Sequence, residues 1–357
     1  MEEVYKQLAE KLHQMPNGFP PTESGVELRI LKKIFSPEEA AMALDLKPIP
    51  ETAEAIGNRL GIPTAEMESV LDSMVRKGQI GTAKTKDRRV YLAVPFVVGI
   101  YEFQEPRLDK ELADLIEEYA PALMPILGGH GPALMRVVPI NAQVKAEHQV
   151  HPYEDIRKML ESAKSFQLSE CICRKERALQ GHECKHTLET CLAFSKQEGA
   201  FDKFATCRII SMEEALKVMA DCEEEGLVHA TYNVKSHQMF VCNCCSCCCG
   251  LLLGMKHFNA PFLVAGSAYV ASVDTDTCIE CGVCADERCP VAAITRTDSG
   301  FVVQSERCIG CGVCTKTCPS EAITLLPRPE AEQEQPPGNI MEWYFKRAES
   351  RGVRIIV

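Results

Sequence analysis

The chain has 357 residues, of which 46% are hydrophobic and 25% are charged, and its formal net charge is −11. This length predicts two or three domains with real hydrophobic cores, and the acidic charge argues against a nucleic-acid scaffold held by phosphate contacts. No stretch approaches the roughly 18 apolar residues of a membrane helix, and the charged segment 1–15 is not typical of an export signal. We therefore expect a cytoplasmic chain whose twenty cysteines do not form disulfides, because the cytosol is reducing.

Residues 1–95 are predicted to be helical and then to form a hairpin. Ser36 marks a helix start, and segments 52–60 and 64–77 flank a short turn. A basic two-stranded hairpin is expected to follow, so the order resembles a winged helix-turn-helix domain. A recognition helix enters DNA with its N-terminal residues, which here include the acidic Glu66. This charge favours a protein-docking role for the domain over DNA binding.

Residues 96–265 are predicted to form a cysteine-rich middle domain. A helix is expected over 153–166, and a capping box at Ser211 predicts another helix that ends near Gly226. Ten cysteines of this region are candidate ligands of a further metal centre: Cys171, Cys173, Cys184, Cys191, Cys242, Cys244, Cys245, Cys247, Cys248 and Cys249. One cluster needs four thiolates, so these ten allow one or two centres. Adjacent cysteines usually point apart, so the six within 242–249 are not expected to face one metal.

Residues 266–327 hold two related cysteine runs, CIECGVCADERCP from Cys278 and CIGCGVCTKTCP from Cys308. Each has three cysteines spaced two apart, then a fourth cysteine followed by proline. The pattern resembles that of bacterial ferredoxins with two [4Fe–4S] clusters, in which the fourth cysteine of each run serves the other cluster. The resemblance implies one cluster on Cys278, Cys281, Cys284 and Cys318, and a second on Cys308, Cys311, Cys314 and Cys289.

The two runs form an internal repeat with a spacing of 30 residues. Each unit is predicted as a short strand, the binding loop, and a short helix after the proline. Four residues separate Cys284 from Cys289, whereas three separate Cys314 from Cys318. The extra residue is expected either to bulge outward or to alter the fourth ligand of that cluster. Zinc is the weaker alternative here, because structural zinc sites use two separated C-x-x-C pairs.

The chemistry of the ten middle cysteines stays open at this point. Soft thiolates select iron–sulfur clusters, zinc or Cu(I), and the neighbouring ferredoxin-like runs favour another iron–sulfur cluster. His182 and His186 flank Cys184 and keep zinc as an alternative. A redox dithiol is the third option. Cys207 and Cys222 are predicted to be buried side chains rather than ligands.

Residues 328–357 are predicted as an acidic, proline-rich linker and a C-terminal tail. The linker composition is typical of disorder. The tail contains the single tryptophan, Trp343. We expect it either to dock on a partner or to fold back on its own domain.

The whole arrangement resembles a family of multi-cluster ferredoxin-like proteins of anaerobic bacteria and archaea, over roughly residues 30–327. Besides the ferredoxin runs, the resemblance rests on CICR from Cys171, ETCL from Glu189 and CNCCSCCC from Cys242. It implies a multidomain α+β fold, iron–sulfur binding, and electron transfer inside a larger redox assembly. The partner class would be a flavoprotein or a larger reductase or hydrogenase-type complex.

We find no motif for independent catalysis, so an electron-carrying subunit of an oxidoreductase is the favoured interpretation. Two other functions stay open from the sequence. The helix-turn-helix motivates a redox-sensing transcriptional regulator, and the surplus of thiols motivates an oxidoreductase that acts at the cysteine-rich centre.

Overall fold

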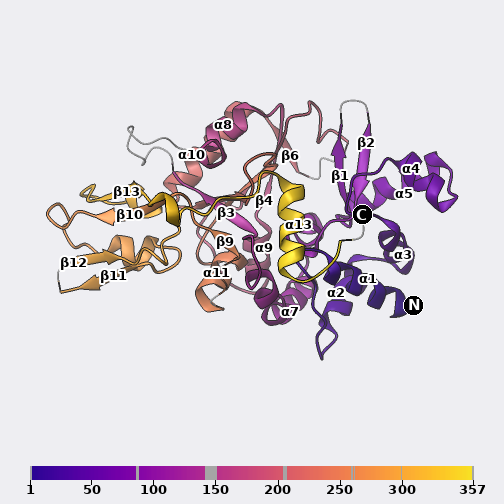
Figure 1. Cartoon of the computed structure of the whole chain (residues 1–357), viewed down its shortest axis with the longest axis horizontal. Coiled ribbons are helices and arrows are strands. Elements are labelled where there is room, and N and C mark those ends of the chain that lie inside the picture. Colours follow the sequence, from indigo (N-terminus) through magenta and orange to yellow (C-terminus); the bar gives the residue numbers. More distant parts are fainter. Residues whose placement is uncertain are drawn as a thin grey trace.

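The structure is a computed structural model that describes residues 2–85, 88–140, 151–203, 207–258, 260, 262–298 and 300–355. It is an elongated α+β molecule (Figure 1). The N-terminal helices lie at one end, a mixed sheet lies in the middle, and the two cysteine runs lie at the other end. Within the described ranges, no helix combines the length and apolar character needed to cross a membrane.

Five helices and a hairpin make up the N-terminal part. They are α1 (Glu2–Gln14), α2 (Val26–Ile34), α3 (Pro37–Asp45), α4 (Ala53–Leu60), α5 (Thr64–Arg76), β1 (Gly81–Lys84) and β2 (Arg89–Leu92). Ser36 caps α3 in a reciprocal capping box with Glu39, and Thr52 caps α4. The predicted helices and hairpin are therefore present, while the winged-helix assignment stays a prediction.

The acidic side of α5 is engaged by the middle of the chain. Lys203 Nζ lies 3.1 Å from Glu68 Oε1 and 2.6 Å from Asp72 Oδ2. Tyr91 of the hairpin donates a hydrogen bond to Asp72 Oδ1 at 2.7 Å, and Lys84 Nζ donates to the carbonyl of Glu198 at 2.8 Å. These contacts hold the N-terminal part against the cysteine-rich region.

A connecting segment leads to one long helix. The segment contains η1 (Phe96–Ile100), α6 (Tyr101–Phe103) and η2 (Glu105–Arg107), and α7 (Lys110–Gly128) follows. Asp109 caps α7 by accepting from the amide of Leu112 at 2.9 Å. Leu115, Tyr119, Leu123 and Leu127 are buried at helical spacing, so one apolar face of α7 packs inward along the helix.

The central sheet has seven strands in the order β6-β4-β5-β8-β7-β3-β9. Their bounds are β3 (Met135–Val138), β4 (Ser165–Glu170), β5 (Glu189–Ser195), β6 (Arg208–Ile210), β7 (Val228–Tyr232), β8 (Phe240–Cys244) and β9 (Val264–Ala265). All pairs are antiparallel except β3 with β9. Helix α10 (Met212–Glu224) packs on α8 (Ile156–Glu161) and on β4 and β5, whereas α7 packs on α9 (Ile172–Leu179) and α11 (Gly250–His257).

The helix predicted over 153–166 is wrong in length. A 3-10 turn, η4 (Pro152–Glu154), precedes α8, which ends at Glu161, and β4 has begun by Ser165. Phe166 and Leu168 are buried on one face of β4, which pairs with strands on both sides. Sheet pairing therefore overrides the helical spacing there. The helix predicted from Ser211 is confirmed as α10.

The ferredoxin-like region is built from two antiparallel strand pairs. Strand β10 (Tyr269–Val273) pairs with β13 (Ile323–Pro327), and β11 (Ile294–Thr297) pairs with β12 (Gly300–Val303). The expectation of a helix after each proline is wrong. Each helical turn, η5 (Cys284–Arg288) or α12 (Val313–Lys316), starts at or next to the third cysteine of its run and ends before the proline, and a strand follows. The residues after each proline instead complete the strand pairs, with Ile294 and Ile323 buried.

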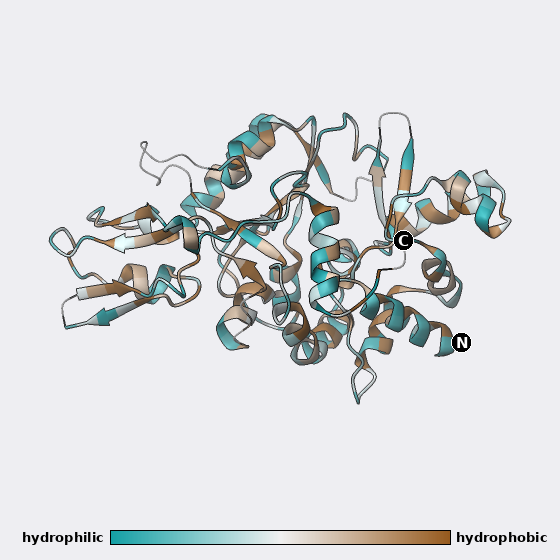
Figure 2. Ribbon diagram, in the orientation of Figure 1, coloured by the Kyte–Doolittle hydropathy of each residue, from teal (hydrophilic) through white to brown (hydrophobic). Residues whose placement is uncertain are grey.

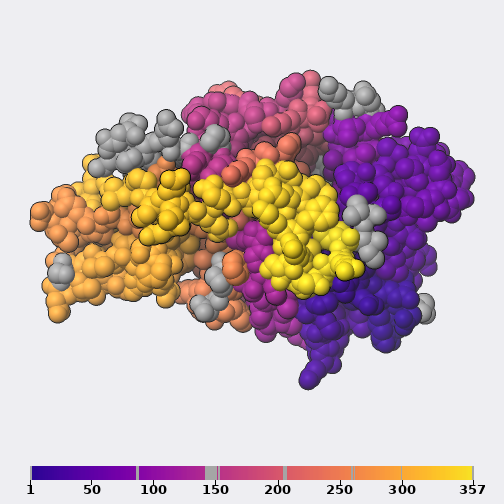
Figure 3. Space-filling model, in the orientation of Figure 1, coloured from indigo at the N-terminus to yellow at the C-terminus, as the bar shows by residue number. Residues whose placement is uncertain are grey.

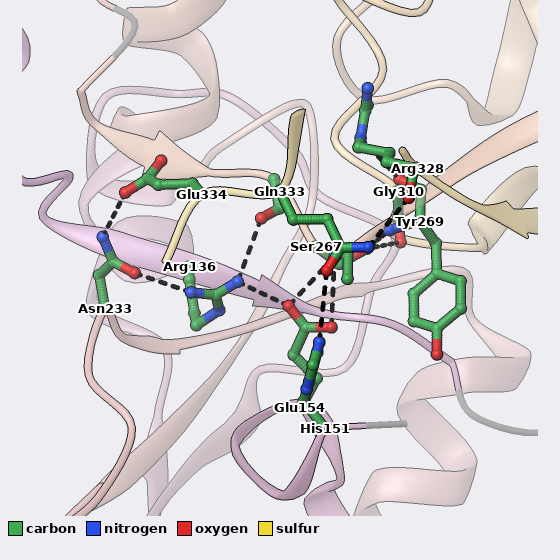
Figure 4. A network of polar contacts seen from close by, with 12 residues as sticks. Arg136, His151, Glu154, Asn233, Ser267, Tyr269, Gly310, Arg328, Gln333 and Glu334 are labelled. Atoms are coloured by element: carbon green, nitrogen blue, oxygen red, sulfur yellow. Dashed lines mark hydrogen bonds and ion pairs between the residues drawn. The ribbon is translucent and has the colours of Figure 1, made fainter. Parts of the chain in front are cut away.

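A buried ion pair fastens this region to the central sheet (Figure 4). Arg136 Nη2, on β3, lies 2.6 Å from Glu154 Oε1, and the two side chains are 1% and 0% exposed. Glu154 also accepts from the amide of Ala268 at 3.1 and 3.2 Å. Ser267 donates to the carbonyl of Gly310 at 2.8 Å. The sheet thereby holds β10 and the second cysteine loop in a fixed relation.

The C-terminal tail folds back on its own chain, which is one of the two expected outcomes. Helix α13 (Ile340–Ser350) crosses the face of the molecule beside the N-terminal helices (Figure 3). Trp343 Nε1 donates to the carbonyl of Ala133 at 2.8 Å. Arg347 is fully buried and donates to Asn17 Oδ1 at 2.9 Å and to the carbonyl of His130 at 2.6 Å.

The linker before α13 is ordered, contrary to the expected disorder. It contains a 3-10 turn, η6 (Glu330–Glu332). Asn233 donates to Glu334 Oε1 at 2.8 Å, and the amide of Lys235 donates to the carbonyl of Pro337 at 2.8 Å. Tertiary hydrogen bonds thus fix a segment whose composition alone favours disorder.

Hydrophobic residues gather inside the molecule, and hydrophilic ones lie on the outer faces of the helices (Figure 2). One cluster of buried side chains runs through the N-terminal helices, the sheet, the second cysteine loop and α13; Leu8, Leu112, Val228, Ile309 and Trp343 belong to it. The domain limits expected at residues 95, 265 and 327 stay predictions.

Candidate metal centres

Two cavities in the ferredoxin-like region are each lined by four cysteines. One is lined by Cys289, Cys308, Cys311 and Cys314, and the other by Cys278, Cys281, Cys284 and Cys318. Each set combines three cysteines of one run with the fourth of the other. The empty volumes are similar, about 330 and 320 Å³. This similarity agrees with a repeated unit that offers two equivalent sites.

The thiols that line the cavity of Cys311 are more deeply buried than those of the other cavity. Cys311 and Cys314 are buried, whereas Cys281, which lines the other cavity, is exposed. Burial raises the pKa of Cys311 to about 12, so a metal has to displace its proton to bind the thiolate. Backbone amides already point at sulfur: that of Ala293 donates to Cys289 Sγ at 3.1 Å. Such hydrogen bonds tune the potential of a cluster.

The extra residue in the first run forms a wider helical turn. The amide of Cys289 donates to the carbonyl of Cys284 at 3.0 Å, which is the i→i+5 bond of a π turn. In the second run the corresponding turn α12 is shorter, and the amide of Cys318 bonds to the carbonyl of Thr315 at 3.3 Å. The extra residue is thus taken up by a wider turn while Cys289 lines the cavity of Cys308, Cys311 and Cys314, and its effect on the fourth ligand stays a prediction.

Gly310 is required by the packing of the second loop. Its φ is +64°, and a Cβ would lie 2.2 Å from the carbonyl oxygen of Tyr269 and 2.3 Å from Ser267 Oγ. The glycine therefore lets the loop approach strand β10.

A family model described as a 4Fe-4S binding domain matches residues 301–324. The segment contains Cys308, Cys311, Cys314 and Cys318. The match and the thiol-lined cavities together support an iron–sulfur protein that binds [4Fe–4S]. No curated protein matches the chain. The multi-cluster family of anaerobes stays a resemblance.

The ten candidate cysteines of the middle region separate into two groups. Six form a closed circle in which each thiol lies close enough to two others for the pair to shift each other's pKa. We call this the six-thiol ring, and its order is Cys171, Cys173, Cys249, Cys244, Cys242, Cys191 and back to Cys171. Thiols from segments almost 80 residues apart in the sequence thus meet at one place.

Sheet register and two helix starts assemble the ring. Cys242 and Cys244 alternate along β8, so they share a face. The pairing of Leu192 with Val241 brings Cys191 of β5 beside Cys242. The remaining thiols come from the N-terminal ends of α9 and α11.

The thiols of the ring fall into two sets that differ in the direction in which their pKa is shifted. Bonds from their neighbours hold the pKa of Cys171 and of Cys249 well below the usual range. The pKa values of the other ring thiols are raised, first because each hydrogen-bonds to a neighbouring ring sulfur and then by burial. The ring therefore stabilises thiolate at two places even before a metal binds.

Protonatable side chains lie near one side of the six-thiol ring, where Cys249 acts on Glu102 and Cys173 acts on Tyr101. Glu102 accepts from the amide of Gly99 at 2.7 Å, and burial raises its pKa to about 7. Burial likewise raises the pKa of Glu176 to about 7, and Tyr101 donates a hydrogen bond to its carboxylate. No sequence motif marks these groups, because they lie outside the cysteine motifs.

The other four thiols form a compact group that we call the four-thiol site: Cys184, Cys245, Cys247 and Cys248. All four sulfurs lie within 4.8 Å of one another. Among the described residues this is the only such group of three or more His, Cys, Asp or Glu ligands, so the six-thiol ring is the wider arrangement. Cys244 and Cys245 belong to different groups, as do Cys248 and Cys249, which agrees with the expectation for adjacent residues. Cys247 and Cys248, however, share one site.

Arg174 lies between the two groups. It is 2% exposed and donates to Thr190 Oγ1 at 2.6 Å and to the carbonyl of Asn243 at 2.8 Å. Burial alone lowers the pKa of Arg174, but Cys171 of the ring and Cys245 of the four-thiol site raise it. Its charge therefore offsets negative thiolates on both sides. An arginine directly after CxC was the available signal in the sequence.

The remaining candidates lie outside both groups. His186 Nδ1 is 3.4 Å from Glu225 Oε2, and neither His186 nor His182 joins the four-thiol site. Cys222 is 2% exposed on α10 and packs beside Leu227, so its predicted burial is confirmed. Cys207 is partly exposed.

Proposed function

We propose that the chain is an electron-transfer protein or subunit with two [4Fe–4S] clusters in the ferredoxin-like region. The ligands would be Cys278, Cys281, Cys284 and Cys318 for one cluster, and Cys289, Cys308, Cys311 and Cys314 for the other. The observation that carries this proposal is the crossed lining of the two cavities. It is the arrangement that two-cluster ferredoxins use.

The six-thiol ring is the further redox centre of this proposal, and it would hold an iron–sulfur cluster. Six convergent thiols exceed the four that a single ion or one cubane requires, so the ring suits a cluster of several irons. Arg174 lies beside it and supplies positive charge to balance thiolates and cluster. When bound, the cluster would accept and donate single electrons.

Packing joins the buried ferredoxin-like cavity to the sheet that carries the ring. The amide of Ile140, at the end of β3, donates to the carbonyl of Cys311 at 3.2 Å. Cys311 and Cys249 belong to one hydrophobic cluster. A contiguous protein medium therefore connects the second cluster to the ring, as a relay needs.

The cavity lined by Cys278, Cys281, Cys284 and Cys318 is the proposed contact point for a redox partner. Cys281 is exposed there, and Ile279 beside it is 63% exposed. The net charge of −11 favours a partner with a basic docking surface. A flavoprotein or a larger reductase is the partner class that fits. We propose that residues 1–95 act as a scaffold in that assembly, since the acids of α5 are held by Lys203.

Anaerobic iron and sulfide analysis of the full chain tests the proposal. Two cubanes require about eight irons per chain, and a cluster at the ring raises the number. The variant Cys222→Ala is the matched control, because that thiol lies outside both groups. Fewer than about eight irons after reconstitution would contradict the two-cluster assignment.

A DNA-binding titration at low salt separates the scaffold role from the regulator. The scaffold role predicts no salt-dependent binding, since phosphate contacts dominate such affinity. Tight binding at low salt would instead favour the redox-sensing regulator.

A further inference from the structure

The spacing of sulfurs in the four-thiol site differs from what a cluster needs. Cys184 Sγ lies 3.9 Å from Cys245 Sγ and 3.7 Å from Cys247 Sγ, and the sulfurs of Cys247 and Cys248 are 3.7 Å apart. Each thiolate of a cubane binds a different iron, so the four sulfurs lie well apart. Four thiolates that share one ion lie much closer together.

A tetrahedral zinc site predicts the observed spacing. With Zn–S bonds of about 2.3 Å, the edge of the sulfur tetrahedron is about 3.8 Å. These three sulfur–sulfur distances lie within about 0.1 Å of that value. All twenty cysteines are free thiols, so the short spacing does not arise from disulfide bonds.

We propose that Cys184, Cys245, Cys247 and Cys248 bind a single Zn²⁺ ion in a closed tetrahedral site. All four positions are filled by sulfur, which is the ligand set of structural rather than catalytic zinc. The site would carry a net negative charge, and the guanidinium of Arg174 is near enough to Cys245 and Cys184 to offset it electrostatically. The ten cysteines of the middle region would then hold two metals of different chemistry.

The ion would position the six-thiol ring. Cys245 and Cys248 directly follow and precede the ring ligands Cys244 and Cys249. Cys184 comes from the loop after α9, whose start carries Cys171 and Cys173. One zinc ion would thus fasten together the two segments that supply five of the six ring thiols. This role rests on the proposed function of the ring, whereas zinc binding itself does not.

Metal analysis of the full chain, purified without oxygen from cells supplied with both iron and zinc, tests the proposal. We expect about one zinc per chain, and loss of that zinc in the double variant Cys184→Ser/Cys247→Ser. Cys222→Ala is the matched control: its thiol packs beside Cys245 and Cys248 but is not one of the four sulfurs, so this variant should keep the zinc. Replacing Cys308, Cys311 and Cys314 by serine should lower iron and leave zinc unchanged, so zinc and the iron clusters are counted independently.

X-ray absorption at the zinc edge of the wild-type protein needs no variant to fold. We expect four sulfur neighbours at about 2.3 Å. Nitrogen or oxygen neighbours would overturn the ligand set, and so would zinc that survives in the double variant. Wild-type protein that holds only iron, with no zinc, would overturn the proposal.

Discussion

The ferredoxin-like region and the cysteine-rich middle gather thiols in different ways. In the ferredoxin-like region three ligands of each cavity come from one loop of seven residues, and only the fourth comes from elsewhere. In the middle region the six-thiol ring draws on two strands and two helix starts. A thiol site built from one loop can be predicted from the cysteine spacing in the sequence. A site that depends on sheet register cannot be predicted in this way.

The two regions also differ in sulfur spacing. The four-thiol site is compact, with sulfurs 3.7 to 3.9 Å apart, whereas the ferredoxin-like thiols surround open cavities. On the proposals made above, the same ligand type would hold a single ion in one place and clusters in another. What decides between them is geometry.

The strongest test of this contrast removes one set of local ligands. Changing Cys308, Cys311 and Cys314 to serine should cost about four irons per chain, because those thiols hold three corners of one cubane. Iron and sulfide analysis under argon provides the measurement. If the contrast holds, the six-thiol ring keeps its iron in this variant; a total loss of iron would show that the regions do not bind metal separately.

The buried ion pair of Arg136 and Glu154, which links the two regions, gives the next largest effect. Arg136→Ala leaves the carboxylate of Glu154 buried and without its ion-pair partner, so unfolding should become easier by about 3–5 kcal/mol. Anaerobic denaturation followed by circular dichroism measures the change. The double variant Arg136→Met/Glu154→Leu removes both charges and should lose much less. Equal losses in the two variants would mean that the ion pair is not what fastens the joint.

The stability of the folded chain should depend on pH through the buried side chain of Glu176. The pKa of Glu176 is about 7 in the folded chain, against an ordinary value of 4.5, because the side chain is buried. Between those values the folded state holds a proton that the unfolded state lacks. This contribution to stability is therefore present below about pH 4.5 and is lost as the pH rises through about 7.

Glu176→Gln should remove that pH dependence, which amounts to at most about 1.4 kcal/mol for each pH unit. Denaturation midpoints at about pH 6 and about pH 8 show it. The exposed Glu213→Gln on α10 is the matched control. A Glu176→Gln variant with the wild-type difference between the two pH values would rule out this source.

The smallest effect concerns the π turn of the first run. Deleting the exposed Glu287 makes the spacing between the third and fourth cysteines equal in both runs. The turn should shorten toward the form of α12 while Cys289 stays in its cavity, so the iron content should not change. A loss of about four irons would show that the extra residue is needed to place the ligand.

These regions show how far the sequence was informative. The resemblance of the two runs to two-cluster ferredoxins implied the same two cysteine sets that line the cavities, while their role as ligands stays a prediction. The helix expected over 153–166 was wrong, since the pairing of β4 with its neighbours is a long-range effect. The division of the ten middle cysteines could not be predicted either, because it depends on the register of β5 with β8.

The tail illustrates the same limit. Its composition allowed both docking and folding back, and only the buried contacts of Trp343 and Arg347 decide between them. The acidic linker was expected to be disordered, yet Asn233 holds it at Glu334. Local composition does not reveal such partners, which lie about 100 residues away or more.

Electron uptake tests the central claim most directly. A coulometric titration of the anaerobic, reconstituted chain should consume at least about two electrons, one for each cubane of the ferredoxin-like region. Electrons that the variant without Cys308, Cys311 and Cys314 still takes up would enter the cubane on Cys278, Cys281, Cys284 and Cys318 and the cluster of the six-thiol ring. A chain with full iron content that takes up fewer than two electrons would contradict its role as an electron carrier.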